Sequence, residues 1–166
     1  MNHKDPNRHT QISKDVLQRV YAHARRSHPE ECVGLLIGPR DTCPVIDHAR
    51  ICENAQNLLH QRDPLTYPRD ARTAYNLGPR DLMFLYESFG SARPVKIVYH
   101  SHANVGAYFS EEDRRMAMVW FENGEPVYDL SYLVIDAQAE RIAGAKLFRW
   151  NALAQDFELI AEYDGE

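Results

Sequence analysis

Apolar residues recur at the spacing of an amphipathic helix in three segments of the chain. The first covers about residues 13–28 and should end before a proline, because a residue that precedes proline is driven out of the α region. The second covers residues 78–90 and has a proline in its first turn, where no backbone N–H is needed. The third runs from Ser110 to residue 121. The pattern therefore predicts three helices.

Strands are predicted where apolar residues run together or alternate with polar ones. The expected strands cover residues 32–38, 45–51, 94–102, 130–136 and 143–150. The first two should pair with each other, and residues 157–162 fit a last strand or a helix. The polar stretch 53–77 has weak periodicity, and its part from Asn54 to Asp63 could form a substrate-binding flap or be disordered. This order of elements predicts an α/β fold in which one sheet is covered by helices.

The composition is that of one globular domain. The chain has 166 residues, of which 44% are hydrophobic, so residues 13–166 can bury a core after a flexible polar tail at 1–12. The longest apolar runs fall far short of the ~18 residues that a transmembrane helix needs, and the first residues lack the apolar stretch of a secretory signal. We therefore expect a cytoplasmic protein with no membrane partner.

Cysteine content and net charge narrow the possible partners. Three cysteines without a C-x-x-C pair argue against a disulfide framework and against a cysteine zinc ribbon, so we expect reduced thiols. Cys32 is expected to serve as a small buried apolar side chain. A net charge of −5 has the wrong sign for a protein that neutralises phosphates, which argues against nucleic acid as a partner.

The pattern that most clearly indicates a metal-binding or catalytic site is His100-x-His102, followed after seven residues by Ser110-x-x-Asp113. Alternation along the strand at 94–102 places both histidines on one face, and Asp113 falls in the first turn of the next helix. Three protein ligands and one open position are typical of catalytic zinc. The spacing therefore predicts one Zn²⁺ per chain, held by His100, His102 and Asp113, that activates water.

A zinc hydrolase also needs a general base and a hydrogen-bond donor for the oxyanion. Glu31, just before the first strand, is the candidate base, and the adjacent Glu30 is its competitor. Ser110 could donate a hydrogen bond to the oxyanion, but Ser110 followed by Asp113 also has the form of a helix capping box. Without the histidines, the capping interpretation of Ser110 would be preferred.

Glu31-x-x-Gly34 at the start of an apolar strand, followed by the His-x-His-x7-Ser-x-x-Asp pattern, resembles the JAMM (MPN-plus) family of zinc metalloproteases over residues 14–150. The position of the glycine favours Glu31 over Glu30 as the base. The site residues that this resemblance implies are the catalytic Glu31 and Ser110 and the zinc ligands His100, His102 and Asp113.

The resemblance also implies a fold and a reaction. The family has a mixed β-sheet sandwiched by helices, related to cytidine deaminases, and the likeness is greatest to a small prokaryotic branch that acts on ubiquitin-like sulfur carriers. We therefore expect a peptidase or isopeptidase that hydrolyses the amide after the C-terminal Gly-Gly of a ubiquitin-like or sulfur-carrier protein. A hydrolase of sulfur-carrier adducts and a non-catalytic interaction module are the alternatives. Ala103 and Phe109 stand where many members have proline, which leaves the rigidity of this loop open.

Some residues outside the motif have two possible roles, and others are assigned no functional role. Tyr108 and Phe109 could line a substrate groove or pack against the core. Lys96, on the histidine face of its strand, could steer an acidic tail or extend to solvent. The remaining histidines have no partner at ligand spacing and are expected to face solvent: His3, His9, His23, His28, His48 and His60.

Overall fold

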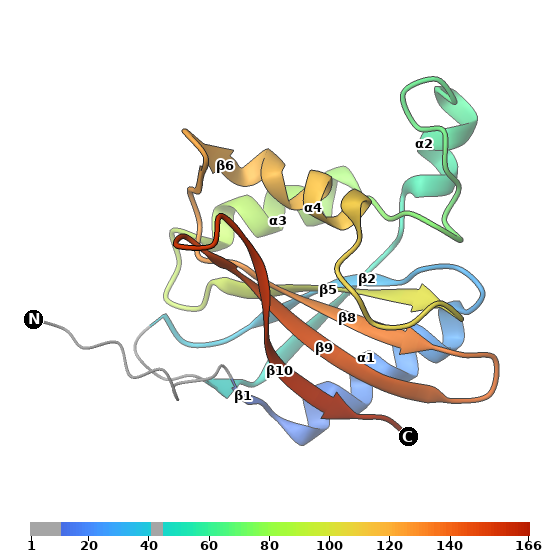
Figure 1. Cartoon of the computed structure of the whole chain (residues 1–166), viewed down its shortest axis with the longest axis horizontal. Helices are drawn as coiled ribbons and strands as arrows, with labels where there is room; N and C mark the ends of the chain where they lie inside the picture. The colour runs from blue at the N-terminus through green and yellow to red at the C-terminus, as the bar shows by residue number, and fades with distance from the viewer. Residues whose placement is uncertain (1–10, 41–44) are drawn as a thin grey trace, which may run out of the picture.

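A six-stranded mixed sheet forms the centre of the protein in a computed structural model that describes residues 11–40 and 45–166 (Figure 1). The strands are β2 (Val33–Ile37), β4 (His48–Cys52), β5 (Val95–Ala103), β8 (Ser131–Ala137), β9 (Ile142–Asn151) and β10 (Asp156–Asp164). They lie in the order β10-β9-β8-β5-β2-β4, and only β5 and β8 run parallel. Residues 157–162, which fitted either element in the sequence, lie in a strand.

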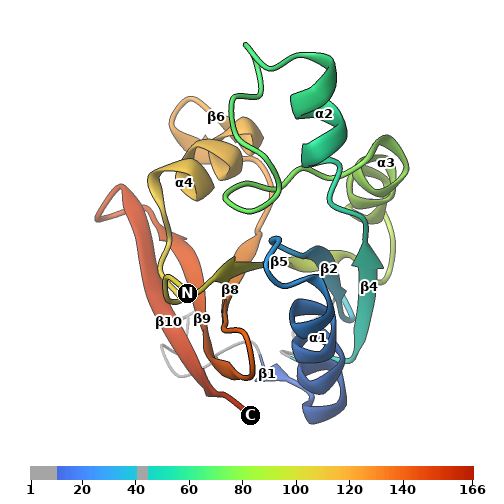
Figure 2. The same cartoon turned by 90° about the vertical axis from the view of Figure 1, so that its right-hand side faces the viewer.

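Helices cover both faces of this sheet. α1 (Lys14–Ser27) packs on one face, and α3 (Pro79–Ser88) and α4 (Glu111–Ala117) lie on the other (Figure 1, Figure 2). Each layer encloses its own cluster of buried apolar side chains. The predicted α/β fold, a mixed sheet sandwiched by helices, is therefore confirmed. Within the described residues, no helix combines the length and the apolar character that crossing a bilayer would need.

Local signals explain where the helices begin and end. Ser13 caps α1 by accepting a hydrogen bond from the backbone N–H of Val16 at 3.3 Å. Pro79 opens α3 at a position that needs no N–H. α4 is shorter than predicted, because the chain continues after it as the 3-10 helix η1 (Met118–Trp120) and then as a small hairpin of β6 (Phe121–Glu122) and β7 (Glu125–Pro126).

The N-terminal region differs from the sequence prediction. The last two residues of the expected tail form β1 (Gln11–Ile12), which pairs in parallel with β3 (Val45–Ile46). The predicted strand at 45–51 is therefore divided: its first part pairs with β1, and β4 pairs with β2. The rest of the expected tail, residues 1–10, lies outside the described residues.

Residues 53–77, for which the sequence predicted no element, form an arm that projects from the sheet (Figure 2). The arm carries α2 (Gln56–Arg62). Asn54 secures its base, because the side-chain amide donates hydrogen bonds to the carbonyls of Glu31 at 2.9 Å and Ala74 at 3.1 Å. Polar side chains thus anchor this segment, which is why apolar periodicity did not reveal it.

Gly34 in β2 lies directly opposite Tyr99 in β5, and its lack of a side chain makes room for the tyrosine ring. A Cβ added to Gly34 would lie 2.3 Å from each of two ring carbons and the hydroxyl oxygen of Tyr99. Tyr99 is fully buried, and its hydroxyl lies 2.9 Å from Nδ1 of His23 in α1. The glycine of the Glu-x-x-Gly pattern therefore has a packing role. It leaves space for the Tyr99 ring, and the Tyr99 hydroxyl forms a hydrogen bond with α1.

The histidines outside the motif do not all face solvent. His23 is buried, so the prediction was wrong for this residue, whereas His48 is exposed as expected. His28 and His60 are partly buried, and the remaining two lie outside the described residues. Burial, with a smaller contribution from Arg26, lowers the pKa of His23 to about 4.

The cysteines follow the prediction where the structure describes them. Cys32 and Cys52 are buried and unpaired, and Cys43 lies outside the described residues. Burial raises the pKa of both thiols to about 12. Cys32 packs in the apolar cluster between the sheet and α1, on the face away from α4.

Replacing Gly34 with alanine should destabilise the protein. The added Cβ has to displace the buried Tyr99 ring, and overpacking of this kind costs about 1–3 kcal/mol. Chemical denaturation should show this loss. The control, Gly90→Ala, places a Cβ 3.7 Å from its nearest neighbour at an exposed position and should change the free energy of unfolding by less than about 0.5 kcal/mol. Equal effects of the two substitutions would contradict the packing role of Gly34.

The buried His23 should make stability fall in mild acid. The unfolded chain binds a proton at His23 near the ordinary pKa of 6.5 and the folded chain only near 4, so stability present at neutral pH is lost as the pH falls through this window. The shift corresponds to about 3 kcal/mol. Urea denaturation between these pH values should show a weaker pH dependence for His23→Gln than for the wild type. The exposed His48→Gln should keep the wild-type dependence, and the same dependence in His23→Gln would refute this explanation.

Candidate metal and catalytic site

The predicted zinc ligands converge at the end of β5. His100 and His102 project from one face of this strand, and Asp113 reaches them from the first turn of α4. Asp113 Oδ1 lies 3.0 Å from His100 Nε2, Asp113 Oδ2 lies 3.2 Å from His102 Nε2, and the two imidazole nitrogens are 3.2 Å apart. All three residues are almost completely buried. The structure thus brings together the three residues that the sequence singled out.

The spacing of these atoms fits a shared metal ion. Tetrahedral bonds of about 2.0–2.1 Å from zinc to two imidazoles place their nitrogens roughly 3.3 Å apart, close to the separation found here. His102 Nδ1 lies 3.0 Å from the carbonyl oxygen of Gly106, which assigns the proton to Nδ1 and leaves Nε2 with a lone pair. His100 stacks on Tyr75 with ring centroids 4.5 Å apart. The donor set and its surroundings therefore suit a divalent ion.

The electrostatics of the site favour a cation. Burial alone would raise the pKa of Asp113, but the two imidazoles outweigh burial and hold this pKa well below its usual range. Burial lowers the pKa of His102, yet Asp113 and Glu31 together raise it by more, so the net shift is upward. The two carboxylates thus concentrate negative charge around the imidazoles, where a positive ion is stabilised.

Ser110 is the N-cap of α4 and orients Asp113. Ser110 Oγ accepts a hydrogen bond from the backbone N–H of Asp113 at 3.1 Å, and Asp113 Oδ2 accepts one from the backbone N–H of Ser110 at 2.8 Å. The capping box that the sequence allowed is therefore present. Because the cap uses Ser110 Oγ as an acceptor, the hydroxyl proton can still be donated to another oxygen. Capping and oxyanion binding are compatible.

Glu31 lies on the same face of the sheet as the two histidines. The antiparallel register sets Val33 opposite His100, and Glu31 precedes Val33 by two residues, close enough to both imidazoles to interact with them electrostatically. Only 7% of Glu31 is exposed. Burial raises the pKa of its carboxyl group, and the nearby imidazoles offset part of the rise. A carboxyl group with these properties beside a metal site can both accept and return a proton.

The arm contributes a wall of the site. Tyr75, near the end of the arm, is buried against His100. Glu30, the competitor for the base, is exposed and accepts a hydrogen bond from Asn57 Nδ2 at 2.8 Å, so it is engaged with the arm. Sequence reasoning did not single out Tyr75, because no motif or periodicity marks an aromatic residue in this polar stretch.

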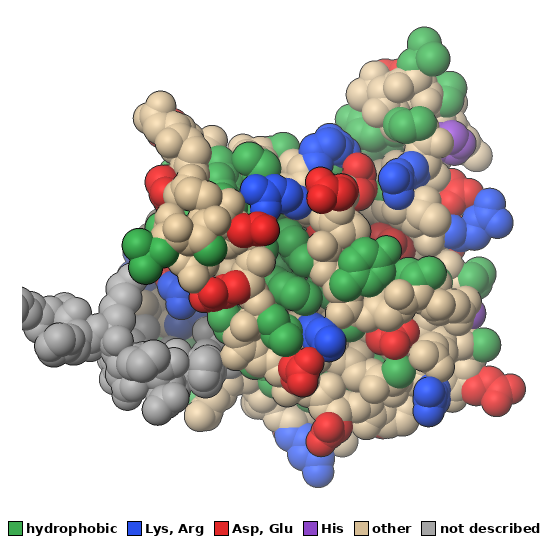
Figure 3. Space-filling view, viewed as in Figure 1, with side chains coloured by type: hydrophobic (Ala, Val, Ile, Leu, Met, Phe, Trp, Pro, Cys, Tyr) green, Lys and Arg blue, Asp and Glu red, His purple; other side chains and the backbone are tan. Residues whose placement is uncertain are grey.

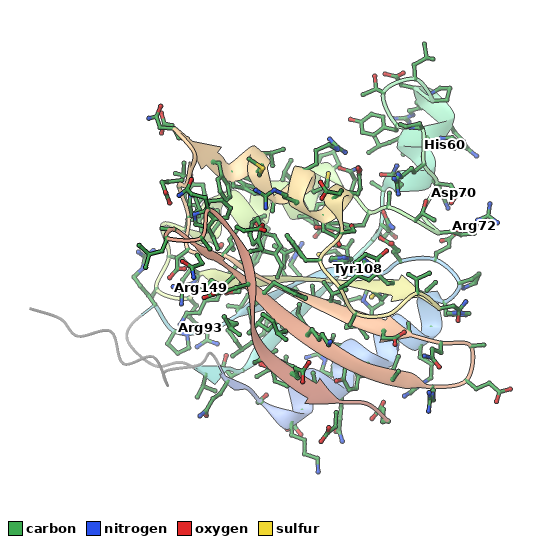
Figure 4. All side chains as sticks on the ribbon, viewed as in Figure 1. His60, Asp70, Arg72, Arg93, Tyr108 and Arg149 are labelled. Carbon is green, nitrogen blue, oxygen red and sulfur yellow. The ribbon has the colours of Figure 1, made fainter. Side chains whose placement is uncertain are left out.

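The two aromatic residues before α4 take different positions. Phe109 packs against the core, with its ring centroid 4.6 Å from that of Phe157. Tyr108 is 50% exposed, and its ring meets that of His102 edge-on at 4.9 Å. Figure 4 shows Tyr108 at the surface beside the loop that leads into α4. Of the two residues, only Tyr108 is therefore placed at the rim of the site.

Known proteins resemble this chain in sequence and in fold. The profile of the prokaryotic homologs of the JAB domain matches residues 13–151. A CysO-cysteine peptidase of Mycobacterium tuberculosis is 30% identical over 107 residues, which make up 64% of this chain and 64% of that relative. The same protein of Mycobacterium bovis matches equally, so the likeness spans 64% of the length of these relatives.

Two solved structures share the fold. A protein from Desulfitobacterium hafniense has a TM-score of 0.57 at 21% identity, over 89% of this chain and 87% of that one. A protein from Salinibacter ruber has a TM-score of 0.55 at 17% identity, over 90% of this chain and 87% of that one. At these identities, the likeness shows the arrangement of helices and strands alone.

The converging side chains predict one divalent ion per chain. Protein that is loaded with zinc and then dialysed should retain one zinc by elemental analysis, and the ion should raise the melting temperature because it binds the folded chain. His102→Ala should lose both the zinc and the thermal shift, whereas His48→Gln, at an exposed position in β4, should keep both. Wild-type zinc content in His102→Ala would exclude His102 as a ligand.

Proposed function

Because the chain belongs to the family of prokaryotic homologs of the JAB domain, we propose that it is a zinc-dependent peptidase or isopeptidase. The reaction is hydrolysis of the amide after the C-terminal Gly-Gly of a ubiquitin-like or sulfur-carrier protein. The observation that carries this proposal is the buried Glu31 close to the two imidazoles, beside three converging ligands. A domain used only for binding has no need of this arrangement, since each buried charge costs desolvation free energy.

His100, His102 and Asp113 would hold the zinc. When bound with one open position, zinc lowers the pKa of a water molecule to about 7 and polarises a carbonyl group. The hydrogen bond between His102 and Gly106 orients one imidazole, and the capping box orients the carboxylate of Asp113. The chain thus presents its ligands in a set geometry before any ion binds.

Glu31 would transfer the proton, and Ser110 would stabilise the negative charge that develops on the oxyanion. Glu31 accepts a proton from the attacking water and returns it to the leaving nitrogen, and its raised pKa suits both steps. Ser110 donates its hydroxyl proton to the oxyanion that forms on the attacked carbonyl. The backbone N–H of Asp113 already binds Ser110 Oγ, which fixes the direction of this hydroxyl group.

The form of the site supports a glycine-rich tail as the substrate. The histidines are buried at the end of a central strand, and a tail without side chains can bring its carbonyl group close to such a position. The exposed ring of Tyr108 at the rim offers an apolar surface for this tail. The likeness to a CysO-cysteine peptidase supports a sulfur-carrier protein as the partner.

Glu31→Gln should separate catalysis from metal binding. Glutamine keeps the size of the side chain and removes the proton acceptor, so hydrolysis should fall by about 100-fold or more while zinc content is unchanged. The probe is a ubiquitin-like sulfur-carrier protein with one alanine added after its Gly-Gly terminus, and mass spectrometry follows the loss of this alanine.

Glu30→Gln is the matched control for this experiment. Glu30 is adjacent in the chain, exposed and bound to Asn57, so its replacement should keep the wild-type rate. Unchanged hydrolysis by Glu31→Gln would contradict the proposed role of Glu31 as the general base. Failure of the zinc-loaded wild type to cleave the probe would contradict the proposed peptidase activity.

A further inference from the structure

A cavity of about 310 Å³ opens between the arm and α4. Its lining includes Arg69 and Asn76 from the arm and Glu112 and Arg115 from α4. Figure 3 shows basic and acidic side chains gathered on the visible face over α4, below the projecting arm. The cavity is therefore polar and charged, unlike the apolar core that lies beneath it.

This cavity adjoins the proposed reaction centre. Glu112 in its wall is the chain neighbour of Asp113, one of the three converging ligands. Arg69 on the opposite wall is close enough to interact electrostatically with both Glu31 and Glu112. The cavity therefore lies on the side of the proposed reaction centre where the arm and α4 meet.

The two arginines of the cavity differ in their partners. The guanidinium of Arg115 is held by Glu112 through hydrogen bonds of 2.6 and 3.1 Å. The guanidinium of Arg69 has no hydrogen bond or ion pair with any residue in the described part of the chain. Its backbone is fixed, because Gln56 Nε2 donates to the carbonyl of Arg69 at 2.6 Å and Asn76 Nδ2 donates to Gln56 Oε1 at 2.7 Å. Arg69 thus has a held backbone and an exposed side chain that interacts with Glu31 and Glu112 only electrostatically, so its N–H donors are available to a ligand.

We propose that Arg69 binds the free α-carboxylate of the amino acid that is released, so that the enzyme removes a single C-terminal residue from its carrier. A guanidinium matches a carboxylate with two parallel hydrogen bonds. The volume of the cavity lies at the low end of the roughly 300–1,000 Å³ of small-molecule sites, which suits one amino acid. A protein linked through a lysine side chain has no carboxylate next to the amide that is cleaved. This inference rests on the proposed peptidase activity and names its leaving group.

Arg69 would act on binding and not on the chemical step. Water adds across the amide: the C–N bond breaks, the hydroxyl group stays on the glycine carbonyl carbon, and the proton passes through Glu31 to the released amine. The α-carboxylate keeps its charge throughout the reaction. Because the contact is the same in the ground state and in the transition state, its loss should raise KM and leave kcat nearly unchanged.

The test compares three probes that differ only after the Gly-Gly terminus of one sulfur-carrier protein. The first ends in an added alanine with a free carboxylate, the second ends in the alanine amide, and the third is joined to the side chain of a lysine in a peptide. The wild type should cleave the free acid with about tenfold higher kcat/KM than either other probe. Arg69→Gln should raise KM for the free acid alone and remove this preference.

Arg72→Gln is the matched control on the same arm. The guanidinium of Arg72 is already held by Asp70 at 2.7 and 3.1 Å, and Figure 4 shows the two residues together, so this substitution should keep the preference. Equal cleavage of acid and amide by the wild type, or an equal effect of Arg69→Gln on both, would overturn the inference alone. Cleavage of none of the three probes would overturn the proposed function together with this inference.

Discussion

The pairing register of β2 and β5 is the constraint on which the site depends. A shift by one residue would turn Glu31 to the opposite face of the sheet from the histidines. The contact of Gly34 with Tyr99 opposes such a shift, because any other side chain opposite the ring would collide with it. Gly34, on the α1 side of the sheet, therefore helps to hold Glu31 and the two histidines on the same opposite face. The hydrogen bond between Tyr99 and His23 extends this constraint to α1.

Asp113 joins the local structure of α4 to the site. Its carboxylate closes the helix cap with Ser110 and also contacts both imidazoles. A buried carboxylate on its own would be costly, and here hydrogen bonds and two imidazoles offset that cost. The same interactions keep the carboxylate charged, which a metal ligand requires. The stability of the helix N-terminus and the charge at the site therefore arise from one side chain.

The convergence of His100, His102 and Asp113 could be predicted because it depends on local geometry. Alternation along a strand sets His100 and His102 on one face, and a capping box sets Asp113 in the first turn of a helix. The burial of His23 could not be predicted in this way, because its partner Tyr99 is 76 residues away in the chain.

The arm escaped prediction for a different reason. It is organised by hydrogen bonds of polar side chains such as Gln56, which leave no apolar periodicity in the sequence. The wall that Tyr75 forms against His100 also depends on how the arm returns to the sheet. Long-range contacts of this kind, in contrast to spacing within one element, are visible only in the folded chain.

The side chain of Asn54 connects the base of the arm to the backbone of Glu31. Its amide nitrogen binds the carbonyl of Glu31, and its Oδ1 accepts hydrogen bonds from the backbone N–H groups of Gln56 at 3.0 Å and Asn76 at 3.1 Å. The backbone of Glu31, the proposed general base, and both ends of the arm thus meet at one side chain. Removal of the whole arm would therefore disturb Glu31 as well, whereas substitutions at the tip of the arm leave this junction intact. Side chains far out on the arm can therefore change without moving the backbone of Glu31, which separates the outer surface of the arm from the junction at its base.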